Sequence, residues 1–291
     1  MILVFTLQLM NVLEALSQAT DLLRDETPDP KQEAELLLSF VLGTNRSYLL
    51  AHVYDGLDDS LVAVFLDSIR ERRRGKPIQF ITGRQDFRGL EFEVTPDVLI
   101  PRSETELVVE EALKCIHERE PTVVDLGTGS GCIAIALAVA LPQARIFAID
   151  LSEPALEIAR KNAAWHGVFS HIQFLSGDLL GPIACLHFEE KIDCIVSNPP
   201  YVSERDFPSL QREVRDWEPK LALVAGNNGL AIYSRLIPEA RKFLKTQGSL
   251  VMEIGFNMKD EVCGLFGSEW RIHKVREDLN GIPRVVVAQK Y

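Results

Sequence analysis

The sequence has few cysteines and histidines, and neither type occurs at a spacing that suggests a metal or redox site. Its 291 residues include five cysteines and six histidines, with no C-x-x-C pair. This usage gives neither a disulfide nor a zinc framework, so we expect no metal and assign no role to a histidine. Such cysteines fit a reducing compartment, and we therefore expect a cytoplasmic protein.

Long apolar segments and an excess of basic residues are also missing. The longest apolar run, residues 132–141, is too short to span a bilayer, and the apolar N-terminus has no basic residue before Glu14, unlike a signal peptide. Lysine and arginine number 31 against 42 aspartates and glutamates, a formal net charge of −11. This balance argues against non-specific binding to nucleic acid or membrane surfaces. We expect no membrane attachment, no stable nucleic-acid binding and a monomer.

The spacing of apolar residues divides the chain into three regions. Residues 1–78 show helical periodicity and predict an N-terminal helical-bundle domain. Because it lies outside the α/β region that follows, this domain is the part of the chain expected to recognise a substrate. Residues 79–99 contain short runs that read as strands, beginning with Phe80-Ile81, and predict a β-hairpin linker. Residues 100–291 alternate between strand and helix patterns, which is typical of a parallel α/β sheet.

Seven strands are expected in the third region, and the last two are expected to pair in antiparallel fashion across a turn at Asn280-Gly281. They span residues 122–127, 145–150, 171–177, 192–196, 248–255, 270–276 and 284–289. Ahead of them, Ser103 and Glu106 have the spacing of a capping box that starts a helix. The segment 102–105 is interpreted either as this plain helix start or as a lip of a functional site.

A basic cluster at residues 70–76 closes the last long helix expected in the helical domain. Basic side chains at a helix C-terminus complement the helix dipole, so a solvated helix end is one interpretation. Contact with a partner is the other.

A glycine-rich loop follows the first strand of the sheet. The pattern Asp125-x-Gly127-x-Gly129-x-Gly131 lets a ligand approach the backbone, but Cys132 stands where a dinucleotide-binding loop needs glycine. Asp150 and Asp178 end the next two strands. Acidic residues at three successive strand ends suit a positively charged nucleoside, and S-adenosylmethionine is such a ligand. The alternative is that these aspartates cap helices.

The segment Asn198-Pro199-Pro200-Tyr201 ends the fourth strand. Its prolines have no N–H and a fixed φ, so the turn is stiff and offers the Asn198 side-chain oxygen and the Pro199 carbonyl as acceptors. Two fixed acceptors beside the Tyr201 ring suit a planar group that carries an NH₂, although a plain turn gives the same pattern. On an amide, such acceptors would aim the nitrogen lone pair and stabilise the charge that grows during methylation, without a strong base.

These motifs resemble a class I S-adenosylmethionine-dependent methyltransferase that methylates amino groups. The N-terminal helices, the hairpin and the block Ile100-Pro101-Arg102-x-Glu104-Thr105-Glu106 extend the resemblance over the whole chain, to the bacterial-type peptide chain release factor glutamine methyltransferases. One departure is Ser103, where the family block has a second proline. The resemblance implies a Rossmann-like seven-stranded sheet preceded by a helical bundle and a hairpin linker.

The resemblance also implies a reaction: a methyl group passes from S-adenosylmethionine to the side-chain amide nitrogen of the glutamine in the Gly-Gly-Gln motif of class I release factors, supporting translation termination, and S-adenosylhomocysteine is left. It assigns catalysis to Asn198, Pro199 and Tyr201, and binding of the glutamine to these residues with Pro200. Cofactor binding is assigned to Asp125, Gly127, Thr128, Gly129, Ser130, Gly131, Asp150, Leu151, Asp178, Leu179 and Asn198.

Three other functions remain as alternatives. A glutamine methyltransferase that acts on a ribosomal protein is the nearest. A DNA adenine methyltransferase shares the Asn-Pro-Pro-Tyr motif, but the acidic charge and the lack of a sizeable basic domain argue against it. A non-catalytic interaction protein is disfavoured because the glycine loop, the acidic residues and Asn198 are intact.

Overall fold

The computed structural model describes residues 10–291, and the apolar N-terminus at residues 1–9 lies outside the described residues. The chain divides into two units, each with its own hydrophobic core. A helical unit comprises residues up to Gly83 together with Arg212–Trp217, and a sheet unit comprises Arg84–Gln211 and Glu218–Tyr291.

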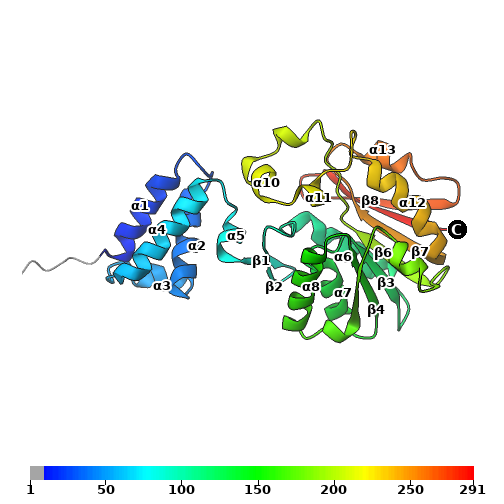
Figure 1. The fold of residues 1–291 in the computed structure, drawn as a ribbon, viewed down its shortest axis with the longest axis horizontal. Coiled ribbons are helices and arrows are strands. Elements are labelled where there is room, and N and C mark those ends of the chain that lie inside the picture. Colours follow the sequence, from blue (N-terminus) through cyan, green and yellow to red (C-terminus); the bar gives the residue numbers. More distant parts are fainter. Residues whose placement is uncertain (1–9) are drawn as a thin grey trace, which may run out of the picture. The chain divides into compact units, whose positions relative to one another are not determined.

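The helical unit is built from short amphipathic helices around a core of aliphatic side chains and Phe65. Its helices are α1 (Val12–Leu23), α2 (Pro30–Leu42), α3 (Arg46–Ala51), α4 (Asp59–Arg73), α5 (Ile78–Thr82) and α10 (Arg212–Trp217), shown in Figure 1. The ends are set locally. Asn11 and Glu14 form a capping box at α1, and Gly43 ends α2 with a φ of 62° that favours glycine.

The strand expected at Phe80-Ile81 is wrong, because these residues lie in α5. The helix begins after Pro77, whose carbonyl accepts hydrogen bonds from the N–H groups of Phe80 and Ile81, and it ends at Gly83 with a φ of 74°. A short apolar run does not distinguish a helix from a strand by its pattern alone. The hairpin itself is present in the sheet unit as β1 (Arg84–Phe87) and β2 (Leu90–Glu93).

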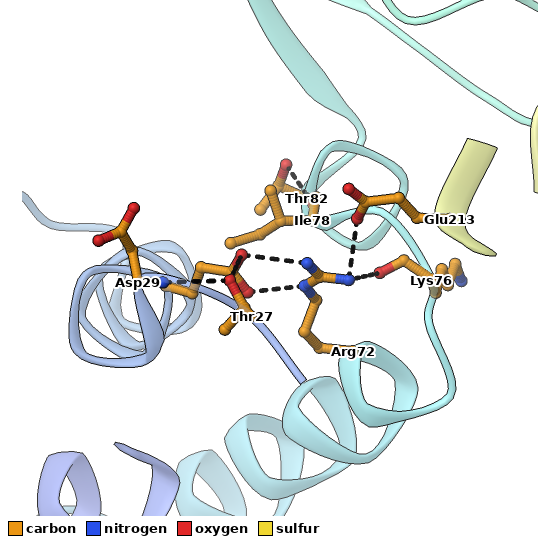
Figure 2. A network of polar contacts seen from close by, with 8 residues as sticks. Thr27, Asp29, Arg72, Lys76, Ile78, Thr82 and Glu213 are labelled. Carbon is orange, nitrogen blue, oxygen red and sulfur yellow. Dashed lines mark hydrogen bonds and ion pairs between the residues drawn. The ribbon is translucent and has the colours of Figure 1, made fainter. Parts of the chain in front are cut away.

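The basic cluster at residues 70–76 is not uniformly exposed, because Arg72 is only 6% exposed. Its Nε donates to Glu33 at 2.6 Å, and its Nη1 lies 3.1 Å from a carboxylate oxygen of Glu213 in α10 (Figure 2). The same nitrogen donates to the Lys76 carbonyl oxygen at 3.3 Å. Arg72 therefore joins α2, α4 and α10 inside the helical unit.

The sheet unit contains all seven expected strands, in the order β5-β4-β3-β6-β7-β9-β8. They are β3 (Thr122–Leu126), β4 (Arg145–Asp150), β5 (Ile172–Ser176), β6 (Ile192–Ser197), β7 (Leu244–Glu253), β8 (Trp270–Glu277) and β9 (Pro283–Lys290). Neighbours from β5 to β7 are parallel, whereas β9 is antiparallel to both β7 and β8. The order reverses between β3 and β6, and sheets of this kind bind ligands at such a point.

Helices cover both faces of this sheet, because successive strand residues point to opposite sides. Val123 packs in one core with residues of α6 (Glu106–Cys115), α7 (Cys132–Ala140) and α8 (Glu153–Trp165). Val124 packs in the other with residues of α12 (Ala231–Phe243) and α13 (Lys259–Cys263). The remaining short elements are η1 (Ser103–Thr105), η2 (Phe169–His171), α9 (Gly181–Ala184), η3 (Phe207–Ser209) and α11 (Lys220–Leu223).

The capping box predicted at Ser103 and Glu106 does not form. A 3₁₀ turn precedes α6, the Ser103 hydroxyl donates to the neighbouring Glu104 carboxylate, and Glu106 accepts a hydrogen bond from the Arg88 N–H. The expected helix nevertheless begins at Glu106. Within residues 10–291 no helix is both long and apolar enough to cross a bilayer.

Candidate active site

A cavity opens at the carboxyl ends of β3, β4, β5 and β6 and brings most of the predicted residues together. Those that line it are Gly127, Gly129, Asp150, Leu151, Asp178, Leu179, Asn198, Pro199 and Pro200. Among the described residues, the lining does not include the predicted Asp125, Thr128, Ser130, Gly131 and Tyr201. The cavity therefore combines the ends of four strands, as expected for a parallel sheet.

Asp125 supports the glycine loop from behind. Its side chain is fully buried, and Oδ2 accepts hydrogen bonds from the Thr128 hydroxyl at 2.7 Å and the Ala134 N–H at 3.2 Å. Burial raises the pKa of this carboxyl to about 7. These contacts fix the loop to the first turn of α7.

The glycine loop packs closely on its surroundings. At Gly131, where φ is 84°, a Cβ would lie 3.1 Å from the Ala159 Cβ, so glycine lets α7 approach α8. A Cβ on Gly127 would lie 3.9 Å from the Asn198 carbonyl oxygen. The loop and the Asn-Pro-Pro-Tyr segment are thus neighbours.

Asp150 is fixed at the end of β4 by backbone donors. One carboxylate oxygen accepts from the Gly129 N–H and the other from the Ser152 N–H, each at 2.9 Å. Burial raises its pKa above the ordinary value for an aspartate. Because a carboxylate oxygen can accept more than one hydrogen bond, Asp150 can still receive hydroxyl groups from a ligand.

Asp178, at the end of β5, is more exposed and pairs with Arg235 of α12. The next residue, Leu179, has a φ of 47° and lines the cavity. Together they give this side of the cavity an ion pair at its rim and an apolar surface inside.

The Asn-Pro-Pro-Tyr segment is held by contacts that the sequence did not reveal. Asn198 Nδ2 donates to the Thr105 hydroxyl oxygen at 2.9 Å, so segment 102–105 does border the site. The Tyr201 ring lies against Gly255, where a Cβ would be 2.9 Å from the Tyr201 Cδ2. Ser197 donates to the Leu126 carbonyl oxygen at 2.8 Å and joins β6 to β3.

Glu253, the last residue of β7, was missed as a site residue. It is 2% exposed, and its Oε2 accepts a hydrogen bond from the Thr105 hydroxyl at 2.6 Å. The Tyr201 hydroxyl donates to Oε1 at 3.4 Å, and burial raises the pKa of this carboxyl to about 7. An acidic residue near the end of a predicted apolar strand was the available signal.

Glu218 is a second missed residue, and the sequence carried no signal for it. This buried carboxylate accepts from the Ile100 N–H at 3.1 Å and pairs with Arg102. Residues 97–99 and residues 219, 221 and 222 line the cavity on either side of these contacts. Glu218 therefore joins two parts of the cavity wall.

Comparison with known proteins identifies two matching regions. The model described as "PrmC N-terminal domain" matches residues 14–83, and the model described as "Methyltransferase domain" matches residues 117–280. A release factor glutamine methyltransferase from Koribacter versatilis is 42% identical, over 91% of this chain and 93% of the relative. Proteins of the same description from Geobacter sulfurreducens and Chlorobaculum tepidum are each 40% identical, over 87% and 88% of this chain and 87% and 89% of their own.

Proposed function

The chain belongs to the release factor glutamine methyltransferase family, and we propose that it transfers a methyl group from S-adenosylmethionine to the side-chain amide nitrogen of a glutamine in class I peptide chain release factors. The glutamine is that of the Gly-Gly-Gln motif. The proposed enzyme acts in the cytoplasm as a monomer. The observation that carries the proposal is one cavity lined by both the glycine loop and Asn198.

The charge of the cavity lining supports S-adenosylmethionine as the cofactor. Asp97, Asp150 and Asp178 line the cavity, and no lysine, arginine or histidine does so among the described residues. Such a lining attracts a cation and disfavours a diphosphate, which proteins bind with basic side chains or free backbone N–H groups. Asp150 would hold the ribose hydroxyls, and the apolar Leu151 and Leu179 would contact the adenine.

Asn198 and Pro199 would orient the substrate amide. Because Nδ2 of Asn198 is bound to Thr105, Oδ1 is the atom of this carboxamide that can accept a hydrogen bond from a ligand. With the Pro199 carbonyl, it would hold both N–H bonds of the glutamine amide. When bound, S-adenosylmethionine would supply the methyl group of its sulfonium to the amide nitrogen, which would lose a proton, and S-adenosylhomocysteine would be left. The two acceptors stabilise the positive charge that grows on this nitrogen.

The experiment that tests the function offers labelled S-adenosylmethionine to the enzyme with a purified release factor, ribosomal proteins or DNA. We expect label on the release factor, mapped by mass spectrometry to its Gly-Gly-Gln glutamine. Replacement of that glutamine in the release factor is the control and should abolish labelling. Label that enters only ribosomal proteins or DNA would overturn the proposal.

The cofactor site is tested separately by calorimetry. Asp150→Ala removes the carboxylate that faces the ribose and holds Gly129, and we expect weaker binding of S-adenosylmethionine by roughly 1–3 kcal/mol. Asp178→Ala removes a carboxylate of the same lining that is half-exposed and paired with Arg235, so it should weaken binding less. Equal affinities in all three proteins would mean that the nucleoside lies elsewhere.

A further inference from the structure

We propose that Thr105 and Glu253 are positioning residues that fix the direction in which the Asn198 carboxamide faces, and that they do so only while Glu253 carries its negative charge. This inference rests on the proposed function and deepens it, because it concerns the residue that would hold the substrate amide.

The three side chains form a continuous chain of hydrogen bonds. Asn198 Nδ2 lies 2.9 Å from the Thr105 Oγ1, which lies 2.6 Å from Glu253 Oε2. Thr105 and Glu253 are each 2% exposed, whereas Asn198 lines the cavity. The chain of hydrogen bonds thus runs from the interior of the sheet unit to the cavity. At its buried end, water does not compete for the bond between Thr105 and Glu253.

The donor and acceptor in each of these hydrogen bonds follow from which side chains carry protons. An ionised carboxylate can only accept, so the single proton of the Thr105 hydroxyl must point to Glu253. The Thr105 oxygen can then only accept, and only the NH₂ end of Asn198 can donate to it. The oxygen end of Asn198 is thereby presented to the substrate amide, which has N–H bonds to donate. Turned over, Asn198 would present N–H groups to N–H groups.

Protonation of Glu253 exchanges the donors and acceptors in these hydrogen bonds. A neutral Glu253 can donate to Thr105, whose own proton is then free to point to Asn198, and Asn198 satisfies it with its oxygen. The NH₂ end would now face the substrate. The buried position raises the pKa of Glu253 to about 7, so both forms are populated near neutral pH.

Other groups around Glu253 set this balance. The negative charge of Glu104 raises the pKa of Glu253, while Arg284 of β9 and the Tyr201 hydroxyl lower it. Arg284 is itself shared with Asp278 at 2.9 Å and Glu104 at 3.8 Å, so it does not neutralise Glu253 alone. Burial, and to a smaller extent the negative charge of Glu253, raises the pKa of the Cys132 thiol in α7. Tyr233 of α12 donates to the Glu253 backbone carbonyl at 2.9 Å.

The test compares the full-length enzyme with Thr105→Ser, Thr105→Val and Glu253→Gln, using intact release factor and saturating cofactor. Thr105→Ser keeps the hydroxyl and should keep kcat. Thr105→Val has nearly the same shape without it, and kcat should fall ~10- to 100-fold, with cofactor affinity unchanged by calorimetry. In the parent, kcat should decline as pH falls through about 7, because the charged form of Glu253 is the active one. Glu253→Gln does not titrate and should lack this decline.

Tyr233→Phe is the matched control. It also removes a hydrogen bond to Glu253, but one to the backbone carbonyl. The hydrogen bonds between the side chains of Asn198, Thr105 and Glu253 stay intact. We expect its kcat and pH profile to follow the parent. Equal rates in Thr105→Val and Thr105→Ser, or an unchanged acid limb in Glu253→Gln, would overturn the inference. If Glu253→Gln does not fold, the threonine pair tests the Thr105 hydroxyl, and a parent kcat that does not decline as pH falls through about 7 would overturn the role of the Glu253 charge. A parent enzyme that leaves release factor unmethylated would instead refute the proposed function.

Discussion

Carboxylates near the ends of three strands serve different purposes in the sheet unit. Asp125 binds Thr128 and the first turn of α7, and Asp150 faces the cavity. Glu253 lies behind Asn198 and contacts it only through Thr105. A strand-end position therefore brings an acidic side chain near the site, while the direction of that side chain decides what it does.

The sequence could predict that residues such as Asp150 lie in the site, but not which side chains contact one another behind it. The spacing of Asp150 and Asn198 after apolar strands was enough to expect them in one cavity, because parallel strands end at one edge. Thr105 lies 93 residues from its partner Asn198 and 148 residues from its partner Glu253 in the chain. Local pattern carries no information on such pairs, so the hydrogen bonds behind Asn198 required the structure.

Asn198 provides the most direct test of the chemistry. Asn198→Ala removes the oriented acceptor beside the reacting nitrogen, and we expect kcat to fall on the order of 10²–10³-fold while the cofactor still binds. The measurement is single-turnover methylation of intact release factor, with calorimetry for cofactor affinity. Near-parental rates would contradict the assigned role of this residue.

Asp125 predicts a pH-dependent stability. Its pKa is raised to about 7 in the folded state, whereas an unfolded aspartate titrates near 3.8. Between these values the unfolded state loses its proton first, so the free energy of unfolding falls as pH rises from about 4 to 7. Asp125→Asn stays neutral and should lack this part of the decline, which amounts to at most about 4 kcal/mol for a shift of roughly three pKa units.

Urea denaturation of parent and Asp125→Asn at pH 5 and pH 7.5 measures this difference. The variant should gain stability relative to the parent at the higher pH, even where the lost charge weakens its bond to Thr128. If the free energy of unfolding changed equally in the parent and in Asp125→Asn between the two pH values, Asp125 would not titrate in this range.

Among the helices and strands, α10 is the one whose place in the helical unit was least expected. The chain leaves the sheet unit after Gln211, forms α10 within the helical unit, and returns at Glu218. Inside the helical unit, Glu213 pairs with Arg72 (Figure 2). The Lys76 ammonium lies 5.7 Å from the centre of the Trp217 ring. The long strands were predictable from apolar runs, but these contacts join residues far apart in the sequence, so the membership of α10 was not.

Arg72 gives a test at this scale. Arg72→Met leaves the partly buried Glu33 with the Thr27 hydroxyl but no cationic partner, and it removes the pair with Glu213, so we expect the helical unit to lose about 3 kcal/mol. Arg73→Met alters the neighbouring, exposed arginine and should change stability by less than about 0.5 kcal/mol. Urea denaturation of both variants is the measurement. Equal shifts would contradict a structural role for the Arg72 ion pairs.

At the scale of the whole molecule, the remaining question is how a release factor is distinguished from other proteins that contain glutamine. One carboxamide resembles another, so a pocket for the amide group alone has little selectivity. We therefore expect contacts outside the cavity, made by the helical unit, to supply it. Arg70, Arg73 and Arg74 border a hollow on the surface of that unit, whereas Arg72 faces inward.

Intact release factor should be methylated far better than a short Gly-Gly-Gln peptide, with both a higher kcat and a lower KM, because remote binding can be used to align the reacting groups. Charge reversal at Arg70, Arg73 and Arg74 together should slow methylation of the intact protein and leave the peptide rate unchanged. Arg119→Glu, at an exposed position of the sheet unit, is the control.

Substitution is a sharper test than deletion of residues 1–83. Deletion would also remove Arg72 and Lys76, and α10 would then lose these partners while Glu218 still joins it to Pro219 in the cavity wall. A loss of activity after deletion could therefore arise in the cavity itself. Exposed charges often contribute little, so the effect of each single arginine is expected to be small and that of the triple variant measurable. If the triple variant treated protein and peptide as the parent does, the arginine surface would not be the recognition surface.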